Sequence, residues 1–333
     1  MNHGVGPGAP GKESMSTHRG TVLRAQSGRY AVLDDSGVVG CRARRRLDRP
    51  DDRFPEYPVP GDEVGWRLHS GAGRHREGII ETVYPRRSEI ARSRFGSRHV
   101  VVANLDRLVV VVAVRDPTLD RGLLDRLLAA AESNGIEALI CFHKADLVDP
   151  LELDPLRRIY ESVGYPVVLT SAETGQGIDA LRETLRGRTS AFMGASGAGK
   201  SRLISVLQPG LELRFGPVSE KTGQGRHTTT RVDLHRTEFG ALLADTPGVR
   251  DFALWRLAPE ELRDLFPEFR EAQQRCHFAR CTHVPEPRCA VQEAVADGSI
   301  EAGRYRSYRA ILDEVRQVDT LDREGRSRRG NKA

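Results

Sequence analysis

One glycine-rich stretch of this sequence has the residue types and spacing of a phosphate-binding loop. Residues 194–201 match G-x-x-x-x-G-K-[ST] at every fixed position, between an apolar strand pattern and a helical pattern. In such a loop backbone N–H groups face the β-phosphate, Lys200 neutralises the β and γ oxygens, and the Ser201 hydroxyl coordinates Mg²⁺. We therefore predict a nucleotide site that contains Gly194, Ala195, Ser196, Gly197, Ala198, Gly199, Lys200, Ser201 and Arg202.

A second motif bears on the identity of the base. His143-Lys144-Ala145-Asp146 follows an apolar strand and is similar to the guanine-reading N-K-x-D motif of GTPases. An aspartate there can accept hydrogen bonds from guanine N1–H and the 2-amino group, a pair of donors that adenine lacks. Ser171-Ala172, at the end of the next strand, resembles the loop whose backbone N–H meets guanine O6. His143 stands where asparagine is usual, so we expect guanine specificity to persist while affinity changes.

The residues that would sense the γ-phosphate come later in the chain. Asp245-Thr-Pro-Gly248 ends an apolar strand as a D-x-x-G motif does, so Asp245 would hold Mg²⁺ through water and the Gly248 N–H would contact the γ-phosphate. The polar segment 225–230, GRHTTT, suits a switch loop, in which we expect Thr229, or alternatively Thr230, to contact Mg²⁺.

The residue that positions the attacking water is not obvious. Val249 occupies the place of the water-positioning glutamine of Ras-like GTPases, and valine can orient no water, so intrinsic hydrolysis should be slow until a partner completes the site. His227 is the in-chain candidate for this catalytic role. The alternative is that His227 only stabilises its loop.

Four residues near the C-terminus have the composition of a structural zinc site. Cys276, Cys281, His283 and Cys289 form C-x(4)-C-x-H-x(5)-C, which offers three thiolates and one imidazole to a tetrahedral ion. His277 is a rival ligand that we rank below His283, because adjacent residues rarely reach the same metal. Cys41 and Cys141 lie in strand patterns and are expected to be buried or partly buried thiols, while Trp255, Phe266 and Phe269 should form core beneath the zinc residues.

The elements that must position these residues follow from the apolar pattern. Five short strands predict a small β-barrel at residues 19–85, either an OB-fold or an SH3-like barrel without a nucleic-acid role. From about residue 109 strands alternate with helices, which implies a parallel sheet covered on both faces. After residue 259 the pattern is helical apart from the Cys/His loop. The expected strands are Thr21–Ala25, Arg29–Leu33, Gly37–Arg42, Glu63–Leu68, Glu77–Val83, Val109–Val114, Ala138–Phe142, Val167–Thr170, Ser190–Met193 and Ala241–Ala244.

Composition and charge restrict the classes of protein. The longest apolar run, Leu108–Val114, is far shorter than the roughly 18 residues of a membrane span, and the N-terminus has no apolar signal region, so we expect a cytoplasmic protein without a membrane partner. The formal net charge is +5. Arginines cluster at 42–53, 86–98 and 323–332, a pattern compatible with a polyanionic partner.

The order of the motifs is diagnostic. Base motifs 143–146 and 170–172 precede the phosphate loop, whereas GTPases ordinarily begin with the phosphate loop, so this chain is circularly permuted. That order, with a barrel before it and a Cys/His cluster after it, resembles the ribosome-small-subunit-dependent GTPases of the RsgA family over about residues 20–315. The resemblance implies an N-terminal OB-fold, a permuted α/β P-loop GTPase domain and a C-terminal helical zinc-binding domain.

The resemblance also implies a function and a domain plan. A monomer would bind GTP with Mg²⁺, hold one structural Zn²⁺, bind the small ribosomal subunit and its rRNA, and hydrolyse GTP to GDP during late subunit maturation. The expected divisions are a disordered tail 1–18, the barrel 19–85, an Arg-rich connector 86–98, the GTPase domain 99–256, the zinc domain 257–320 and a basic disordered tail 321–333. Two alternatives are a metabolic ATP-dependent kinase and a zinc/OB nucleic-acid-binding module with a vestigial nucleotide site.

Overall fold

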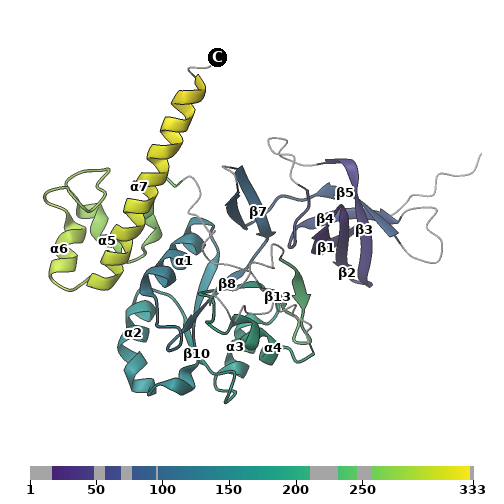
Figure 1. Cartoon of the computed structure of the whole chain (residues 1–333), viewed down its shortest axis with the longest axis horizontal. Coiled ribbons are helices and arrows are strands. Elements are labelled where there is room, and N and C mark those ends of the chain that lie inside the picture. Colours follow the sequence, from purple (N-terminus) through teal and green to yellow (C-terminus); the bar gives the residue numbers. More distant parts are fainter. Residues whose placement is uncertain are drawn as a thin grey trace, which may run out of the picture. The chain divides into compact units, whose positions relative to one another are not determined.

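The computed structural model describes residues 17–48, 57–68, 77–94, 97–210, 232–245 and 257–330. Contacts divide the chain into two units, one formed by Met1–Pro58 with Asp62–Pro85 and the other by Val59–Gly61 with Arg86–Ala333 (Figure 1). Among the helices of the described ranges, none has the length and apolar character needed to cross a membrane.

The first unit contains a closed five-stranded barrel in the strand order β1-β2-β3-β5-β4. β1 pairs with both β2 and β4, which closes the barrel, and β3 and β5 run parallel. Inward-facing residues such as Val22, Val32 and Ile80 are fully buried. This order is that of the OB-fold, which confirms the predicted barrel. The strands are β1 (His18–Gln26), β2 (Arg29–Asp34), β3 (Gly37–Asp48), β4 (Glu63–Leu68) and β5 (Glu77–Val83).

Two strands that the sequence pattern did not predict follow the barrel. β6 (Glu89–Arg94) and β7 (Ser97–Ala103) form an antiparallel pair within the segment expected as a connector and just beyond it. Ile90 and Val102 are opposite one another in this pair and are both buried. The many arginines obscured the alternation, because charged residues are depleted in typical strand patterns.

The second unit is built on a six-stranded sheet in the order β10-β9-β8-β11-β13-β12. All neighbours are parallel except the edge strand β12, which is antiparallel to β13. The long separation between paired strands requires helical crossovers, as the sequence predicts. The strands are β8 (Arg107–Ala113), β9 (Glu137–His143), β10 (Val167–Thr170), β11 (Thr189–Met193), β12 (Leu234–Arg236) and β13 (Leu242–Asp245).

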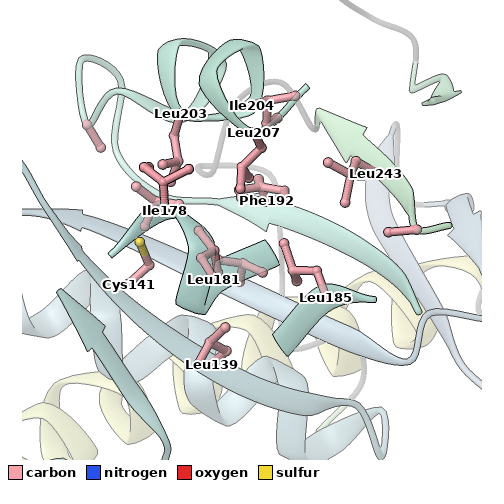
Figure 2. Packing of buried hydrophobic residues seen from close by; sticks show 14 of the residues in the cluster. Leu139, Cys141, Ile178, Leu181, Leu185, Phe192, Leu203, Ile204, Leu207 and Leu243 are labelled. Carbon is pink, nitrogen blue, oxygen red and sulfur yellow. The ribbon is translucent and has the colours of Figure 1, made fainter. Parts of the chain in front are cut away.

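Helices cover both faces of the sheet. α3 (Ile178–Leu185) and α4 (Lys200–Leu207) pack on one face, where Leu181, Leu203 and Leu207 lie close to Phe192 of β11 (Figure 2). The same cluster contains Val109, Val111 and Ala113 of β8. α1 (Arg121–Ser133) packs on β8 and β9 from the other face, and α2 (Pro150–Ser162) contacts β10. α1 and α2 start at the aspartates Asp120 and Asp149, whose carboxylates accept hydrogen bonds from the first helical turn.

A small helical module ends the described chain. Its core contains Phe266, Phe269 and Tyr308, all fully buried, and it includes Ala129 of α1, so the module packs on the α/β part of the same unit. The predicted burial of Phe266 and Phe269 is therefore confirmed. The elements are η3 (Leu262–Leu265), α5 (Phe269–Ala272), η4 (Gln273–Arg275), α6 (Ala290–Ala296) and α7 (Ala302–Gly330).

A buried arginine joins this module to α1. The side chain of Arg304 is 1% exposed and donates to Asp125 Oδ1 at 2.6 Å, while its other guanidinium nitrogens donate to the two carboxylate oxygens of Glu268 at 2.7 and 3.0 Å. The hydroxyl of Tyr160 donates to Asp125 at 2.8 Å, and the guanidinium carbon lies 4.8 Å from the centroid of the Phe266 ring. Because these charged groups are buried away from water, replacing Arg304 would leave buried charges without a partner and destabilise the fold.

Candidate functional site

The predicted nucleotide-binding residues meet at one edge of the sheet. β9, β10, β11 and β13 are parallel, so their carboxyl ends point the same way, and the segments that follow them lie along the same edge. The register brings Phe192 opposite Asp245, and His143 opposite both Ala113 and Thr170. Circular permutation therefore changes the order of the motifs along the chain without dispersing them in space.

The phosphate loop connects β11 to α4 through left-handed backbone conformations. Gly197 and Gly199 have φ values of 79° and 92°, which disfavour any residue with a Cβ atom. Gly194 is also sterically required, because a Cβ atom there would lie 2.0 Å from the Val111 carbonyl oxygen. Lys200 Nζ donates to the carbonyl oxygens of Gly194 and Ala195, both at 2.9 Å, so its ammonium lies over the loop.

The Lys-x-Asp part of the base motif forms a short turn at the end of β9. Lys144 adopts the left-handed conformation with φ 61° and caps η1 (Ala145–Leu147), which leaves Asp146 exposed. Lys144 Nζ donates to the backbone carbonyl of Asp116, in the loop between β8 and α1. This contact holds the stem of Lys144 across the edge of the sheet, beside the exposed carboxylate.

The companion loop after β10 is a compact turn stabilised by Ser171. The Ser171 hydroxyl accepts from the N–H groups of Glu173 and Thr174, each at 3.1 Å, and its own N–H donates to Gln176 O. A Cβ atom at Gly177 would lie 1.9 Å from Leu169 O, so glycine is required where the turn meets α3. Ala172 is partly exposed at the edge that the base motif also occupies.

The residue at the asparagine position of the base motif is buried. His143 is 2% exposed, its Nδ1 lies 2.9 Å from the Thr170 hydroxyl oxygen, and that oxygen lies 3.1 Å from Cys141 Sγ. Burial, followed by the neighbouring charge of Lys144, lowers the pKa of His143 below its usual value. Cys141 is fully buried as predicted, and burial raises the pKa of its thiol to about 12.

Several predicted residues lie outside the described part of the chain. These are the switch-loop residues His227, Thr229 and Thr230, together with Gly248, Val249 and Trp255. For Asp245 the backbone position alone is described, at the end of β13 beside the phosphate-loop strand.

The four predicted metal ligands come together in the C-terminal module. One possible ligand atom from each of Cys276, Cys281, His283 and Cys289 lies within 4.8 Å of the others. His283 Nδ1 is 3.6 Å from Cys276 Sγ and 3.4 Å from Cys289 Sγ, and the two sulfurs are 3.9 Å apart. His277 lies elsewhere, with its ring 4.8 Å from that of Phe278 and its Nε2 3.4 Å from Arg288.

The chemistry of this cluster suits a cation. Burial raises the pKa of Cys281 to about 12, raises that of Cys289 above its ordinary value and lowers that of His283 to about 4, so without a cation two neutral thiols would lie beside a neutral imidazole. Thiols this close together form only weak hydrogen bonds with one another. A divalent ion would displace their protons and bind all four groups. The donor set of three sulfurs and one nitrogen is that of structural zinc sites.

Comparison with known proteins decides the family. A family model described as RsgA GTPase matches residues 83–255. The chain belongs to the RsgA GTPase family.

The relatives extend this match to nearly the whole chain. The small ribosomal subunit biogenesis GTPase RsgA of Gemmatimonas aurantiaca is 45% identical over 300 residues, which cover 89% of this chain and 97% of the relative. The protein of the same name from Moorella thermoacetica is 42% identical over 296 residues, with coverage of 89% and 97%.

Two solved structures have the same fold. YjeQ from Thermotoga maritima is 33% identical with a TM-score of 0.73, covering 90% of this chain and 99% of its own. YloQ, described as a circularly permuted GTPase, is 27% identical with a TM-score of 0.71, covering 93% and 98%. The predicted family, the permuted GTPase fold and GTP hydrolysis as the activity are thereby confirmed.

Sequence reasoning missed the supports of the RsgA-type site. Asp116 accepts a hydrogen bond from Lys144, and Pro117 of the same β8–α1 loop lies beside Gly197 of the phosphate loop, yet this loop belongs to no recognisable motif. Thr170 belongs to the predicted motif 170–172, but its hydrogen bond with His143 was not predicted.

Proposed function

We propose that this GTPase binds the small ribosomal subunit and its rRNA, acts late in the subunit's maturation, and hydrolyses GTP to GDP and phosphate with turnover stimulated by the subunit. The observation that carries the proposal is the meeting of permuted GTPase motifs at one sheet edge, in a chain that also has an OB-fold barrel and a three-cysteine, one-histidine cluster. The curated relatives are named for small-subunit biogenesis, which supports the choice of partner.

We assign the nucleotide contacts by the position of each residue at the sheet edge. Asp146, exposed beside Lys144 and Ala145, would accept from guanine, while Ser171 and Ala172 would present the backbone N–H to O6. Residues 194–202 would cradle the phosphates. The ammonium of Lys200 already lies over the loop carbonyls, so phosphate oxygens can replace those weaker acceptors without a large movement of the side chain.

The reaction requires water to attack the γ-phosphorus as the bond to the β–γ bridging oxygen breaks, giving GDP and inorganic phosphate. Mg²⁺ neutralises charge on the phosphates when it is bound. Ser201 and Thr229 would hold this ion directly and Asp245 through water, and the Gly248 N–H would contact the γ-phosphate. With valine at position 249, the water has no glutamine to orient it. His227 or a group of the subunit would supply that function.

We propose that the Cys/His cluster holds one structural zinc ion. Each of its four residues contributes one ligand atom, which leaves no position for a substrate, so the ion would stabilise the module rather than react. We also propose a monomeric chain with the domain divisions 19–85, 99–256 and 257–320, an Arg-rich connector at 86–98 and a basic tail at 321–333. β7 extends across the division at 98/99, and α7 extends across that at 320/321 to Gly330, so most of the tail expected to be disordered is helical.

Arginines of the barrel would supply part of the affinity for rRNA. Arg42 and Arg44 are exposed on β3, although Arg42 is paired with Glu77 at 2.6 Å and Arg44 lies 4.0 Å from Glu81. Exposed ion pairs contribute about 0–1 kcal/mol, so a phosphate can displace these carboxylates at small cost. Arg86 is different, because its side chain is 15% exposed and is held by Glu89, which makes it a structural residue.

The test is the rate of GTP hydrolysis as a function of small-subunit concentration at two salt concentrations. We expect slow turnover by the protein alone, stimulation by subunits, and a steep loss of stimulation at high salt because counterions are released on binding. The variant R42Q/R44Q should need more subunit for half-maximal stimulation. The exposed Arg186, paired with Glu183 on α3, provides the matched control R186Q. Absence of stimulation by subunits would contradict the proposal.

A further inference from the structure

His143 is the one residue of the base motif whose type departs from the usual pattern, and its surroundings explain how it works. The ring is almost completely buried between Thr170 on β10 and the phosphate loop. A Cβ atom at Gly199 would lie 2.6 Å from His143 Cδ2 and 2.9 Å from Nε2, so the Nε2 edge of the ring packs against the backbone of Gly199. His143 therefore touches both the base-recognition strands and the residue that precedes Lys200.

The tautomer of His143 follows from counting the hydrogens of its neighbours. The Cys141 thiol keeps its proton, since burial raises its pKa to about 12, and the Thr170 oxygen is a hydrogen-bonding partner at 3.1 Å. If the thiol donates to Thr170, the hydroxyl proton of Thr170 is left for Nδ1 of His143 at 2.9 Å. In the opposite arrangement the Thr170 hydroxyl would donate to Cys141 Sγ, a weak acceptor, and the thiol hydrogen would make no hydrogen bond with Thr170.

We propose that the chain Cys141–Thr170–His143 fixes the imidazole as the neutral Nε2–H tautomer, and that His143 is thereby a positioning residue that couples the guanine-recognition strands to the phosphate loop. The proposal rests on the nucleotide site assigned above and adds a device specific to this chain. The neutral ring holds β9, β10 and the start of α4 in fixed positions relative to one another, and its Nε2–H group faces the phosphate loop.

Protonation of His143 would break this arrangement. Nδ1 would become a donor, so it could no longer accept from Thr170, and a positive charge would be buried beside Lys144, which directly follows His143 in the chain. Asp146, on the following turn, is the opposing charge, and both Asp146 and a hydrogen bond to the backbone of Thr170 favour the protonated form. The burial that lowers the pKa thus favours the neutral form, and nucleotide binding that depends on it is lost as the pH falls through the lowered pKa.

The first test is the affinity for fluorescent GDP from pH 7.5 to pH 5.0, for the wild type and for H143N. Asparagine is the conservative variant, because its amide can also bond Thr170 but does not titrate. Whatever the affinity of H143N at pH 7.5, the ratio of wild-type to H143N dissociation constants should rise about threefold or more between pH 7.5 and pH 5.0. Titration of the GDP phosphate is common to both proteins and cancels in this ratio.

The second test reads the tautomer directly, by NMR of nitrogen-labelled imidazole groups at pH 7.5, with H143N identifying the signals. We expect a protonated Nε2 and an unprotonated Nδ1 in the wild type and in T170S, which keeps the hydroxyl. T170V removes it, and should change the tautomer signal and speed GDP dissociation about tenfold, the equivalent of one buried hydrogen bond.

Three results would overturn the proposal: a ratio of dissociation constants that does not change with pH, an Nδ1–H or doubly protonated ring at pH 7.5, or equal GDP dissociation from T170V and T170S. These differ from failure of the proposed function. If the wild type bound no guanine nucleotide at pH 7.5, the nucleotide site itself would be wrong.

Discussion

Replacement of Arg304 by methionine should destabilise the second unit strongly. The substitution keeps much of the side-chain volume but removes the cation that pairs with Asp125 and Glu268, whose side chains are 0% and 6% exposed. Breaking a buried pair by removing one partner costs about 3–5 kcal/mol, because a charge remains without compensation. For a unit of this size 1 kcal/mol corresponds to about 2–4 °C, so R304M should melt about 6–20 °C below the wild type.

A matched control exists between the same two parts of the chain. Arg270 of α5 pairs with Glu132 of α1 at 2.8 Å, but the two side chains are 55% and 25% exposed. Solvent screens this pair, so R270M should cost less than about 1 kcal/mol. Thermal unfolding followed by circular dichroism measures both variants, and calorimetry shows whether the module and the sheet still unfold together.

A triple variant identifies the cause of the loss. R304M/D125N/E268Q removes the uncompensated charges together with the cation, so it should recover part of the stability that R304M loses. The reasoning is refuted if R304M melts within about 2 °C of the wild type, or if the triple variant is as unstable as R304M. The second result would mean that lost packing on Phe266, rather than buried charge, sets the cost.

Three further predictions concern the site. D146N should weaken GTP binding by about 3 kcal/mol, roughly a hundredfold, and gain xanthine nucleotide, since an amide donates where the carboxylate accepted; equal binding of ATP and GTP by the wild type in a competition titration would contradict this. K200A should lower the rate of GTP hydrolysis by about 10²–10³, and a rate near that of the wild type in a phosphate-release assay would show that the loop is misassigned. C289S should lower the zinc content below one ion per chain and lower the melting temperature, as metal analysis and calorimetry can check; a metal-free wild type that melts like C289S would argue against the zinc site.

Local patterns predicted most of the sheet and the arrangement of the site. The phosphate loop and the apolar runs of β8, β9 and β11 are recognisable because each combines a short-range pattern with the composition its environment demands. The Cys/His cluster was predictable for the same reason, since all four residues fall within 14 positions of the chain.

Features that depend on distant residues could not be predicted. Arg304 looks like one more surface arginine of a charged helix, because Asp125 lies 179 positions earlier in the chain. The bond between His143 and Thr170 depends on a parallel register that no local pattern specifies. The short edge strand β12 has three residues, too few to show an alternation.

The position of β11 in the sheet has a consequence for synthesis of the protein. Within this sheet β8, β9 and β10 are made first, and β11, which pairs with the free side of β8, is complete 23 residues after Thr170 is added. At roughly 5–20 residues per second this interval lasts about 1–5 s, during which the hydrogen-bonding groups of β8 have no strand on that side. An unpaired edge of this kind invites pairing with other chains. The half of the domain assigned to guanine recognition is therefore made before any phosphate loop exists, and nucleotide bound through its phosphates cannot assist this first stage of folding.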